Sequence, residues 1–248
     1  PDVMRSAAAT VTEAGAAIVD INMGCPVRKV MKTGAGASML RDQDLAVRIA
    51  RGAIEGAGGR PVTVKLRSGL KAGDRSGFEL ALKLEEAGVA GIGFHPRSAQ
   101  THHKGSPDYE LARELAGRLE IPMIISGGLD TADAARHAYE ASGADAVMIA
   151  RGSLGNPWIF EELTGRRTAP ATRDEIVDEL LWVIDRAEEH MGADRASRYL
   201  RKFYPWYLER LDADKPTAAA FQSSDSLDEA RSLAGRLREP VALSGSTA

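Results

Sequence analysis

The sequence predicts an α/β fold with a parallel sheet, followed by an all-helical segment. Three observations predict it: short apolar segments recur along the first part of the chain, helical stretches alternate with them, and no further strand pattern follows residue 160. Such alternation favours right-handed crossovers between parallel strands. The sheet is therefore either open and doubly wound or part of a (β/α) barrel.

Each predicted element follows from its own pattern. Residues 2–14 form an amphipathic helix, with Val3, Ala7, Val11 and Ala14 on one face. Five apolar, β-branched segments have the length of buried strands: 17–21, 61–66, 90–94, 122–126 and 144–149. Four amphipathic helices separate these strands: 43–55, 77–87, 109–119 and 131–141. The predicted first domain spans residues 1–163.

The C-terminal part has a different pattern. Residues 164–172 contain glycine, proline and two arginines, which is typical of a linker. Helices are predicted at 174–189, 194–211 and 227–237, with Pro205 interrupting the second. Residues 244–248 are expected to be disordered. The predicted helical domain spans 173–240.

The amino-acid composition and net charge limit the kinds of site and the cellular location that the protein can have. The 248 residues carry a net charge of −3 and one cysteine, so no disulfide framework or multi-cysteine zinc site is expected, and no metal is predicted. A cytoplasmic location fits this cysteine usage and the lack of a signal peptide or a long apolar span. The chain begins within a helix pattern, so we expect it to be a truncated form of a longer protein.

The chemically useful residues follow the strands. Polar and glycine-rich loops occur at 22–36, 67–76, 95–105, 127–130 and 151–157, which would share one rim. Active sites of (β/α) barrels lie at that rim, and phosphate groups are often held by its last two loops. Backbone amides of Gly127 and Gly128, with the guanidinium of Arg151, could bind a phosphate there.

Three rim residues are candidates for catalysis or binding. Cys25 lies in Asn-Met-Gly-Cys-Pro directly after a strand and could act as a nucleophile or general acid, although spacing alone favours a buried spectator cysteine. Lys65 is the penultimate residue of an apolar strand and must reach the rim or a buried partner. His95 follows the next strand and is as consistent with a structural donor as with a functional one.

These segments resemble bacterial tRNA-dihydrouridine synthases, beginning with the NMGCPVRKV stretch at Asn22 to Val30. The resemblance continues through Val64 to Arg67, His95 to Ser98, Ser126 to Gly128, Ala150 to Phe160 and the helical tail. It implies a TIM barrel that holds FMN, a helical domain that helps to bind tRNA, and reduction of the uridine C5–C6 bond with electrons from NADPH or NADH.

The resemblance also implies roles for individual residues. Cys25 matches the proton donor to uracil C5, while the flavin delivers hydride to C6. The matches to flavin-binding residues are Lys65, His95, Ser126, Gly127, Gly128, Ala150 and Arg151. Ser126 stands where the family commonly has asparagine, so a hydroxyl would replace an amide contact.

The resemblance does not cover the N-terminal part of the family's barrel. The family's first three barrel strands, with a Pro-Met-Ala flavin motif and a flavin-contacting glutamine, have no counterpart before Pro1. We therefore expect a partial barrel with five of eight strands, exposed sheet edges and incomplete activity in this chain alone.

RNA contact is predicted in two places. In the tail, Arg198, Arg201 and Lys202 recur at helical spacing with Arg195 and would form a basic face, while Tyr199, Phe203 and Tyr207 would form a separate aromatic face. A solvated basic face over an ordinary core is an equally good interpretation. On the rim, the candidates are Arg28, Lys29 and Arg97.

Two alternative functions remain open at this point. One is an FMN barrel oxidoreductase that acts on a free pyrimidine, similar to dihydroorotate dehydrogenase, which would have little use for a basic helical appendage. The other is a non-catalytic RNA-binding remnant. The sequence indicates no DNA, membrane or obligate protein partner.

Overall fold

The structure is a computed structural model that describes residues 1–239, and it contains two compact units. The first unit spans Pro1–Ala150 and the second begins at Arg151. The predicted disorder at 244–248 and the last residue of the predicted helical domain, Pro240, lie outside the described residues.

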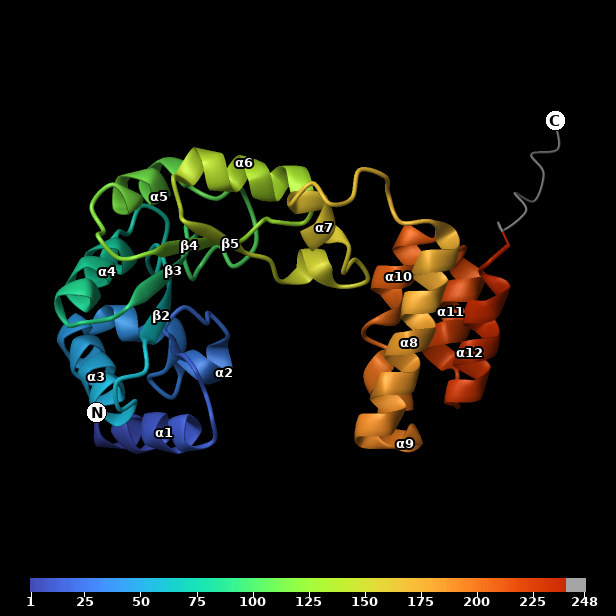
Figure 1. The fold of residues 1–248 in the computed structure, drawn as a ribbon, viewed down its shortest axis with the longest axis horizontal. Helices are drawn as coiled ribbons and strands as arrows, with labels where there is room; N and C mark the ends of the chain where they lie inside the picture. Colours follow the sequence, from blue (N-terminus) through green and yellow to red (C-terminus); the bar gives the residue numbers. More distant parts are fainter. Residues whose placement is uncertain (240–248) are drawn as a thin grey trace. The chain divides into compact units, whose positions relative to one another are not determined.

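The first unit contains every strand of the described chain (Figure 1). Its elements are α1 (Asp2–Glu13), β1 (Val19–Asn22), α2 (Arg28–Met31), η1 (Gly36–Arg41), α3 (Gln43–Gly56), β2 (Val62–Arg67), α4 (Ser76–Glu86), β3 (Gly91–His95), α5 (Tyr109–Ala116), β4 (Met123–Ser126), α6 (Ala132–Ser142) and β5 (Ala146–Met148). All five predicted strands are present, each within two residues of its predicted start.

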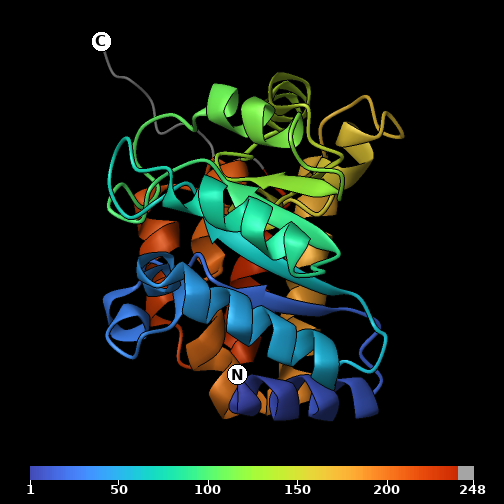
Figure 2. The same ribbon diagram turned by 90° about the vertical axis from the view of Figure 1, so that its left-hand side faces the viewer.

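The sheet has the strand order of a barrel. Its five strands are parallel and pair in chain order, β1-β2-β3-β4-β5. A doubly wound sheet reverses its order at a switch point and carries helices on both faces. Here the order never reverses, and α3 to α6 cover one face (Figures 1 and 2). The unit is therefore a partial (β/α) barrel, in which β1 and β5 are edge strands within the described range.

Alternation along the strands separates a core face from a polar face. Side chains such as Val64, Phe94 and Ile125 are fully buried, beneath the covering helices. Their neighbours in sequence point to the opposite face because successive side chains of a strand alternate. That second face, on the inside of the partial barrel, carries the candidate site.

Helix α1 approaches α3 through two glycines. A Cβ at Gly52 would lie 2.6 Å from the carbonyl oxygen of Pro1, and one at Gly56 would lie 2.0 Å from that of Arg5. Only glycine allows the two helix backbones to lie this close. Arg5 adds an ion pair to Glu55 at 2.7 Å on the exposed edge of the contact.

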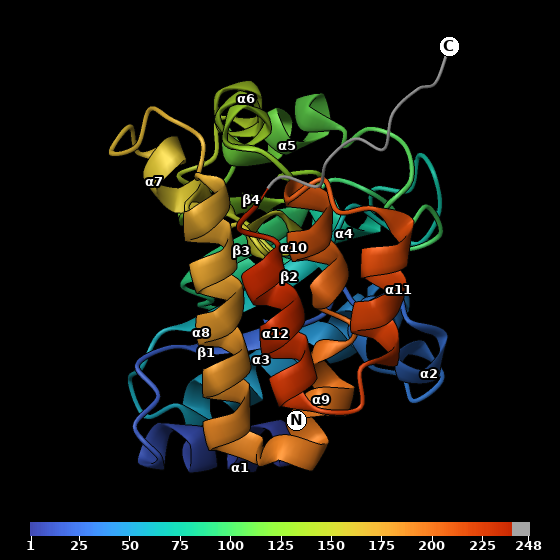
Figure 3. The ribbon, with the colours of Figure 1, turned by 90° about the vertical axis from the view of Figure 1, so that its right-hand side faces the viewer.

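The second unit is helical throughout its described part. Its elements are η2 (Arg151–Ser153), α7 (Ile159–Leu163), α8 (Arg173–Met191), α9 (Ala193–Leu200), α10 (Tyr204–Arg210), α11 (Lys215–Ser223) and α12 (Leu227–Arg236). Figure 3 shows the five helices α8 to α12 gathered in a bundle. The sequence predicts a domain boundary after residue 163, whereas η2 and α7 group here with the helices that follow.

The capping residues and Pro205 explain where α8 begins and where the predicted helix 194–211 is interrupted. Thr172 and Glu175 form a reciprocal capping box at the start of α8, which satisfies backbone donors of the first turn. The predicted helix 194–211 is interrupted as expected, but the break falls at residues 201–203. Pro205 then lies in the first turn of α10, where its missing N–H costs little. The sequence interpretation missed α11.

The bundle core is aromatic and apolar. Tyr204 and Phe221 are buried with ring centroids 5.0 Å apart. Arg173 donates to the carbonyls of Leu211 and Leu237, at 2.9 and 3.1 Å. Because these carbonyls end α10 and α12, one guanidinium joins three helix ends.

Candidate active site

The inner face of the sheet carries polar side chains and, on β3, glycines that have no side chain. Thr63 donates to Asp20 across β1 and β2 at 2.7 Å. On β3, Gly91 and Gly93 occupy this face, and a Cβ at Gly93 would lie only 3.1 Å from Lys65 Cγ. Barrel interiors are usually filled by large apolar side chains. The missing side chain at Gly93 therefore leaves room for the Lys65 side chain to cross the inner face.

Cys25 lies in a loop fixed by backbone contacts. The side-chain oxygen of Asn22 accepts hydrogen bonds from the amides of Gly24 and Cys25, both at 3.1 Å. The Cys25 carbonyl accepts from Ala37 at 3.0 Å. Gly36, with φ of 62°, closes the loop, because a Cβ there would lie 2.6 Å from the Cys25 carbonyl oxygen. Cys25 is half-buried, and these contacts hold its backbone just after the carboxyl end of β1.

Lys65 points across the inner face, past β3, to the end of β4. Its Nζ donates to Ser126 Oγ at 2.7 Å. Burial, and then the positive charge of Arg67, lower the pKa of Lys65 to about 8, while Asp20 opposes the shift. The Ser126 hydroxyl is therefore the acceptor that this lysine uses.

His95 presents a buried ring nitrogen without a partner. The side chain is 7% exposed, and its Nε2 forms no hydrogen bond within the described residues. Burial, and then the charges of Arg67 and Lys65, lower the pKa of His95 to about 2, so the ring is neutral. A Cβ at Gly127 would lie 2.1 Å from Nε2. Only a glycine at position 127 leaves room for the His95 ring.

Arg67 joins two loops from inside the unit. Its Nε donates to the carbonyl of Gly24 at 3.0 Å, and Nη1 donates to those of Ser98 and His102 at 3.0 and 2.7 Å. The side chain is 3% exposed, and burial lowers its pKa. Sequence reasoning did not assign Arg67 to the site, because its partners are carbonyls that only the fold brings together.

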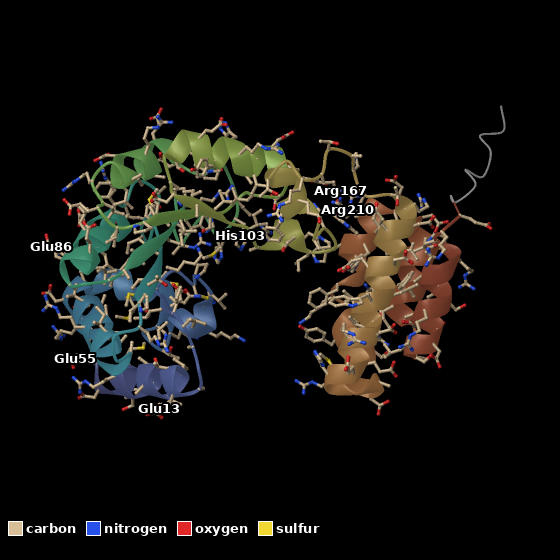
Figure 4. The ribbon with its side chains drawn as sticks, viewed as in Figure 1. Glu13, Glu55, Glu86, His103, Arg167 and Arg210 are labelled. Carbon is tan, nitrogen blue, oxygen red and sulfur yellow. The ribbon has the colours of Figure 1, made fainter. Side chains whose placement is uncertain are left out.

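The loop after β3 folds back over this region. Arg97 donates to the Gly105 carbonyl through Nε and Nη2, at 3.1 and 2.6 Å. His103, labelled in Figure 4, stacks on His95 with ring centroids 6.3 Å apart. The guanidinium of Arg97 also lies close to Gly128, where a Cβ would meet it at 3.3 Å. Arg97 therefore holds the loop after β3 in place, and it also brings a positive charge close to Gly128.

Comparisons with known proteins identify the family. The family model described as dihydrouridine synthase matches residues 1–240. The chain belongs to this family. The tRNA-dihydrouridine synthase B of Shewanella oneidensis is 35% identical over 217 residues, which cover 86% of this chain and 67% of that protein. The tRNA-dihydrouridine synthase B of Pseudomonas syringae pv. tomato is 34% identical over 248 residues, covering 95% and 70%.

A similarity to solved structures was also found. Morphinone reductase in complex with tetrahydroNAD superposes with a TM-score of 0.48 and 18% identity, covering 70% of this chain and 50% of that one. The sequence match to the dihydrouridine synthase family is far more extensive, since it spans the whole described chain.

Within this member of the dihydrouridine synthase family, the structure brings some predicted residues together and leaves others apart. Cys25, Lys65, His95, Ser126, Gly127 and Gly128 all lie at the carboxyl ends of β1 to β4 or in the loops that follow them. Ala150 ends the first unit, and Arg151 begins the second, in η2. Arg28 and Lys29 are exposed in α2.

The predicted separation of the basic and aromatic faces of the tail needs a correction. Arg198 is exposed as expected, but Arg201 donates to the Ser224 carbonyl at 2.9 Å. The Lys202 ammonium lies 3.7 Å from the centre of the Tyr199 ring and 5.2 Å from that of Phe203. The aromatic and basic faces are therefore not separate, because a flexible lysine gains from lying over an aromatic ring.

Two features are absent from the part of the chain that the structure describes. No helix within residues 1–239 is both long and apolar enough to span a bilayer. Across the same range, His, Cys, Asp and Glu side chains form no group of three or more that could hold a metal ion.

Proposed function

We propose that this protein is a tRNA-dihydrouridine synthase that reduces the C5–C6 bond of specific uridines in tRNA, using FMN and NADPH or NADH. The observation that carries the proposal is that Cys25, Lys65 and His95 lie at the carboxyl ends of three adjacent strands, β1, β2 and β3. The chain that carries them belongs to the dihydrouridine synthase family. Curated relatives named for tRNA support the choice of substrate.

The inner face of the first unit has features that suit a flavin. His95 Nε2 is buried without a partner and could donate to or accept from a ring heteroatom. Gly127 leaves room for the His95 ring, and Gly93 leaves room for the Lys65 side chain. We assign Lys65, His95, Ser126, Gly127 and Gly128 to the flavin site.

Ala150 and Arg151 are assigned to the flavin phosphate on sequence pattern, since a guanidinium binds phosphate strongly. When bound, FMN would supply the hydride that adds to uracil C6. NADPH or NADH would supply the electrons.

Cys25 would supply the proton that completes the reaction. Addition of hydride at C6 leaves an electron pair at C5, and a thiol proton transferred to C5 gives the saturated ring. The fixed backbone from Asn22 to Gly36 suits this role, because general acid catalysis requires the donor to lie within hydrogen-bonding reach of the reacting atom. His95, neutral at physiological pH, would position the ligand without adding charge.

Binding of tRNA is assigned to both units. Arg28 and Lys29 in α2, and Arg97 in the loop after β3, would contact the RNA close to the reacting base. Arg198, Arg201 and Lys202 would contact it from the helical domain at 173–240, while the catalytic domain is assigned to 1–163. Phosphate contacts of this kind position RNA without reading its sequence.

Reconstitution with FMN tests the proposal. The purified full-length protein should retain FMN, oxidise NADPH through it and form dihydrouridine in unmodified tRNA. Retention of FMN without any reaction on tRNA, but with turnover of a free pyrimidine, would favour a dihydroorotate dehydrogenase-like enzyme. Binding of tRNA without retention of FMN would favour a non-catalytic RNA-binding protein.

A further inference from the structure

A cavity of about 450 Å³ lies beside the Cys25 loop, in the first unit. Pro26, the residue after Cys25, forms part of its wall. The rest of the wall comes from α2, the end of η1 and the loops after β2 and β3. Its size is within the usual range for small-ligand sites. The residues already assigned to the flavin do not line it.

The polar side chains of the cavity wall are basic or neutral. Arg28, Lys32, Arg41 and His102 line the wall, together with Met31, Leu70 and other neutral residues, and no aspartate or glutamate does. Three basic side chains therefore line one open cavity. Clefts lined by charges of one sign concentrate the field and attract ligands of the opposite sign.

These cations lack the partners that others in the unit have. Arg28, Lys32 and Arg41 form no ion pair with any carboxylate of residues 1–239, whereas Arg75 pairs with Glu114 at 2.6 Å. Glu55 and Glu86 lie on the helix-covered side of the strands, away from His103 on the other side (Figure 4). The positive charge at the cavity is therefore available to an anion.

The backbone at the cavity wall is held in an uncommon conformation. His102 has φ of 53°, which residues other than glycine seldom adopt. Its amide donates to the Ala99 carbonyl at 3.3 Å, and its carbonyl accepts from Arg67 at 2.7 Å. Such conformations persist where surrounding contacts fix them, and they concentrate at ligand sites. Arg67 thus fixes this part of the wall.

We infer that this cavity binds the phosphate group of a phosphate ester. The inference rests on the proposed function, which brings two such ligands to the protein: the backbone of tRNA next to the reacting uridine, and the phosphates of NADPH. Both present oxygens that arginine and lysine bind through charge-assisted hydrogen bonds. Lys32, Arg41 and His102 are the residues that this inference adds to the site.

The test uses Lys32→Gln and Arg41→Gln in the FMN-loaded protein. Both side chains are exposed and form no ion pair in the described chain, so the fold should be retained, which thermal melting checks. The matched control is Arg48→Gln, which removes one exposed arginine from α3, outside the cavity. Binding of unmodified tRNA and the KM for NADPH in flavin reduction are measured separately.

The RNA backbone and NADPH, as the two sources of the phosphate, predict different results in these measurements. If the cavity holds the RNA backbone, each variant weakens tRNA binding about tenfold and lowers the slope of log K against log salt by about 0.7 to 0.9, with the KM for NADPH unchanged. If it holds NADPH, the KM for NADPH rises about tenfold and tRNA binding is unchanged. Either result supports the phosphate site, provided that Arg48→Gln behaves as the parent.

The inference fails if both variants match Arg48→Gln in tRNA affinity, salt slope and KM for NADPH. That failure is distinct from failure of the proposed function, in which the parent itself would bind no tRNA or form no dihydrouridine. A parent that reduces tRNA normally, with variants that do the same at every salt concentration and tRNA concentration, would overturn the phosphate site alone.

Discussion

The surroundings of Cys25 define how its role can be tested. The thiol belongs to a loop fixed by Asn22 and Ala37, so a substitution that removes sulfur alone should leave the loop in place. It is also the only cysteine of the 248 residues. Any thiol-directed reagent therefore reports on this position without further mutation.

We predict that Cys25→Ala retains FMN and flavin reduction by NADPH but forms dihydrouridine about a hundredfold more slowly, because loss of a general acid has a cost of that order. Single-turnover kinetics with unmodified tRNA measure the step. Turnover at the parent's rate would remove Cys25 from the mechanism.

Lys65 makes stability depend on pH. Its folded pKa of about 8 lies below the ordinary value of 10.5, so between these values the unfolded chain binds more protons than the folded chain. The free energy of unfolding contributed by this group therefore rises with pH across that window. Below pH 8 the cost of burying the charge is fully present.

We predict that Lys65→Met loses this rise. Urea unfolding at several pH values between 7 and 10.5 should show the parent gaining, relative to the variant, on the order of 3 kcal/mol across the window. Comparison of the two proteins removes the contribution of other groups that titrate there. Parallel curves would mean that Lys65 is not desolvated in the folded protein.

At the scale of elements, the turn after β4 depends on a glycine for two reasons. Gly127 has φ of 98°, and a Cβ there would meet the His95 ring. Gly15 has the same φ, but a Cβ at that position would have no atom within 4 Å. The pair therefore separates backbone strain from the effect on His95.

We predict that Gly127→Ala weakens FMN retention about tenfold or more, whereas Gly15→Ala does not. Both should lose about 1 kcal/mol of stability from left-handed backbone strain, and Gly127→Ala should lose more because its Cβ would lie 2.1 Å from His95 Nε2. FMN titration by fluorescence and thermal melting provide the two readouts. Equal FMN affinity in both variants would show that the β4 turn does not contact the flavin.

The helices and strands also show how much of the fold could be predicted from the sequence. The five strands were found because a strand of a covered parallel sheet reads as a short apolar run. Helix α11 was missed, although Asp214 caps it, because its nine residues carry little amphipathic pattern. The contacts of Arg67 and the strained His102 could not be predicted, since they depend on loops that meet only in the fold.

At the scale of the whole molecule, charge is distributed unevenly. Acidic residues outnumber basic ones from Arg151 onward, so RNA binding by the helical unit must rely on local cations. Many of its arginines are already engaged: Arg231 and Arg238 pair with carboxylates of α8. Arg198 and Lys202 form no ion pair within the described chain.

We predict that Arg198→Ala with Lys202→Ala weakens tRNA binding and flattens its salt dependence, with flavin reduction by NADPH unchanged. Arg201 is left intact because it supports the Ser224 carbonyl. The control is Arg236→Ala with Lys215→Ala, which removes the same charge elsewhere in the unit. An identical loss in both double variants would show a general field effect without a specific contact.

Arg151 tests the assignment of the flavin phosphate. We predict that Arg151→Ala purifies largely without FMN, because a charge-assisted contact to the phosphate is lost. Added FMN should restore the parent's rate of the chemical step. A variant that purifies fully loaded would show that the phosphate is bound elsewhere.

The contacts of Arg67 have a thermodynamic consequence. One guanidinium holds the Gly24 carbonyl, beside Cys25, and the His102 carbonyl, at the wall of the cavity. The conformational freedom of the two loops is therefore shared, and restricting one reduces the entropy that the other still has to lose. Reciprocity then requires that an anion bound against His102 and a pyrimidine engaged at Cys25 strengthen each other's binding by the same factor.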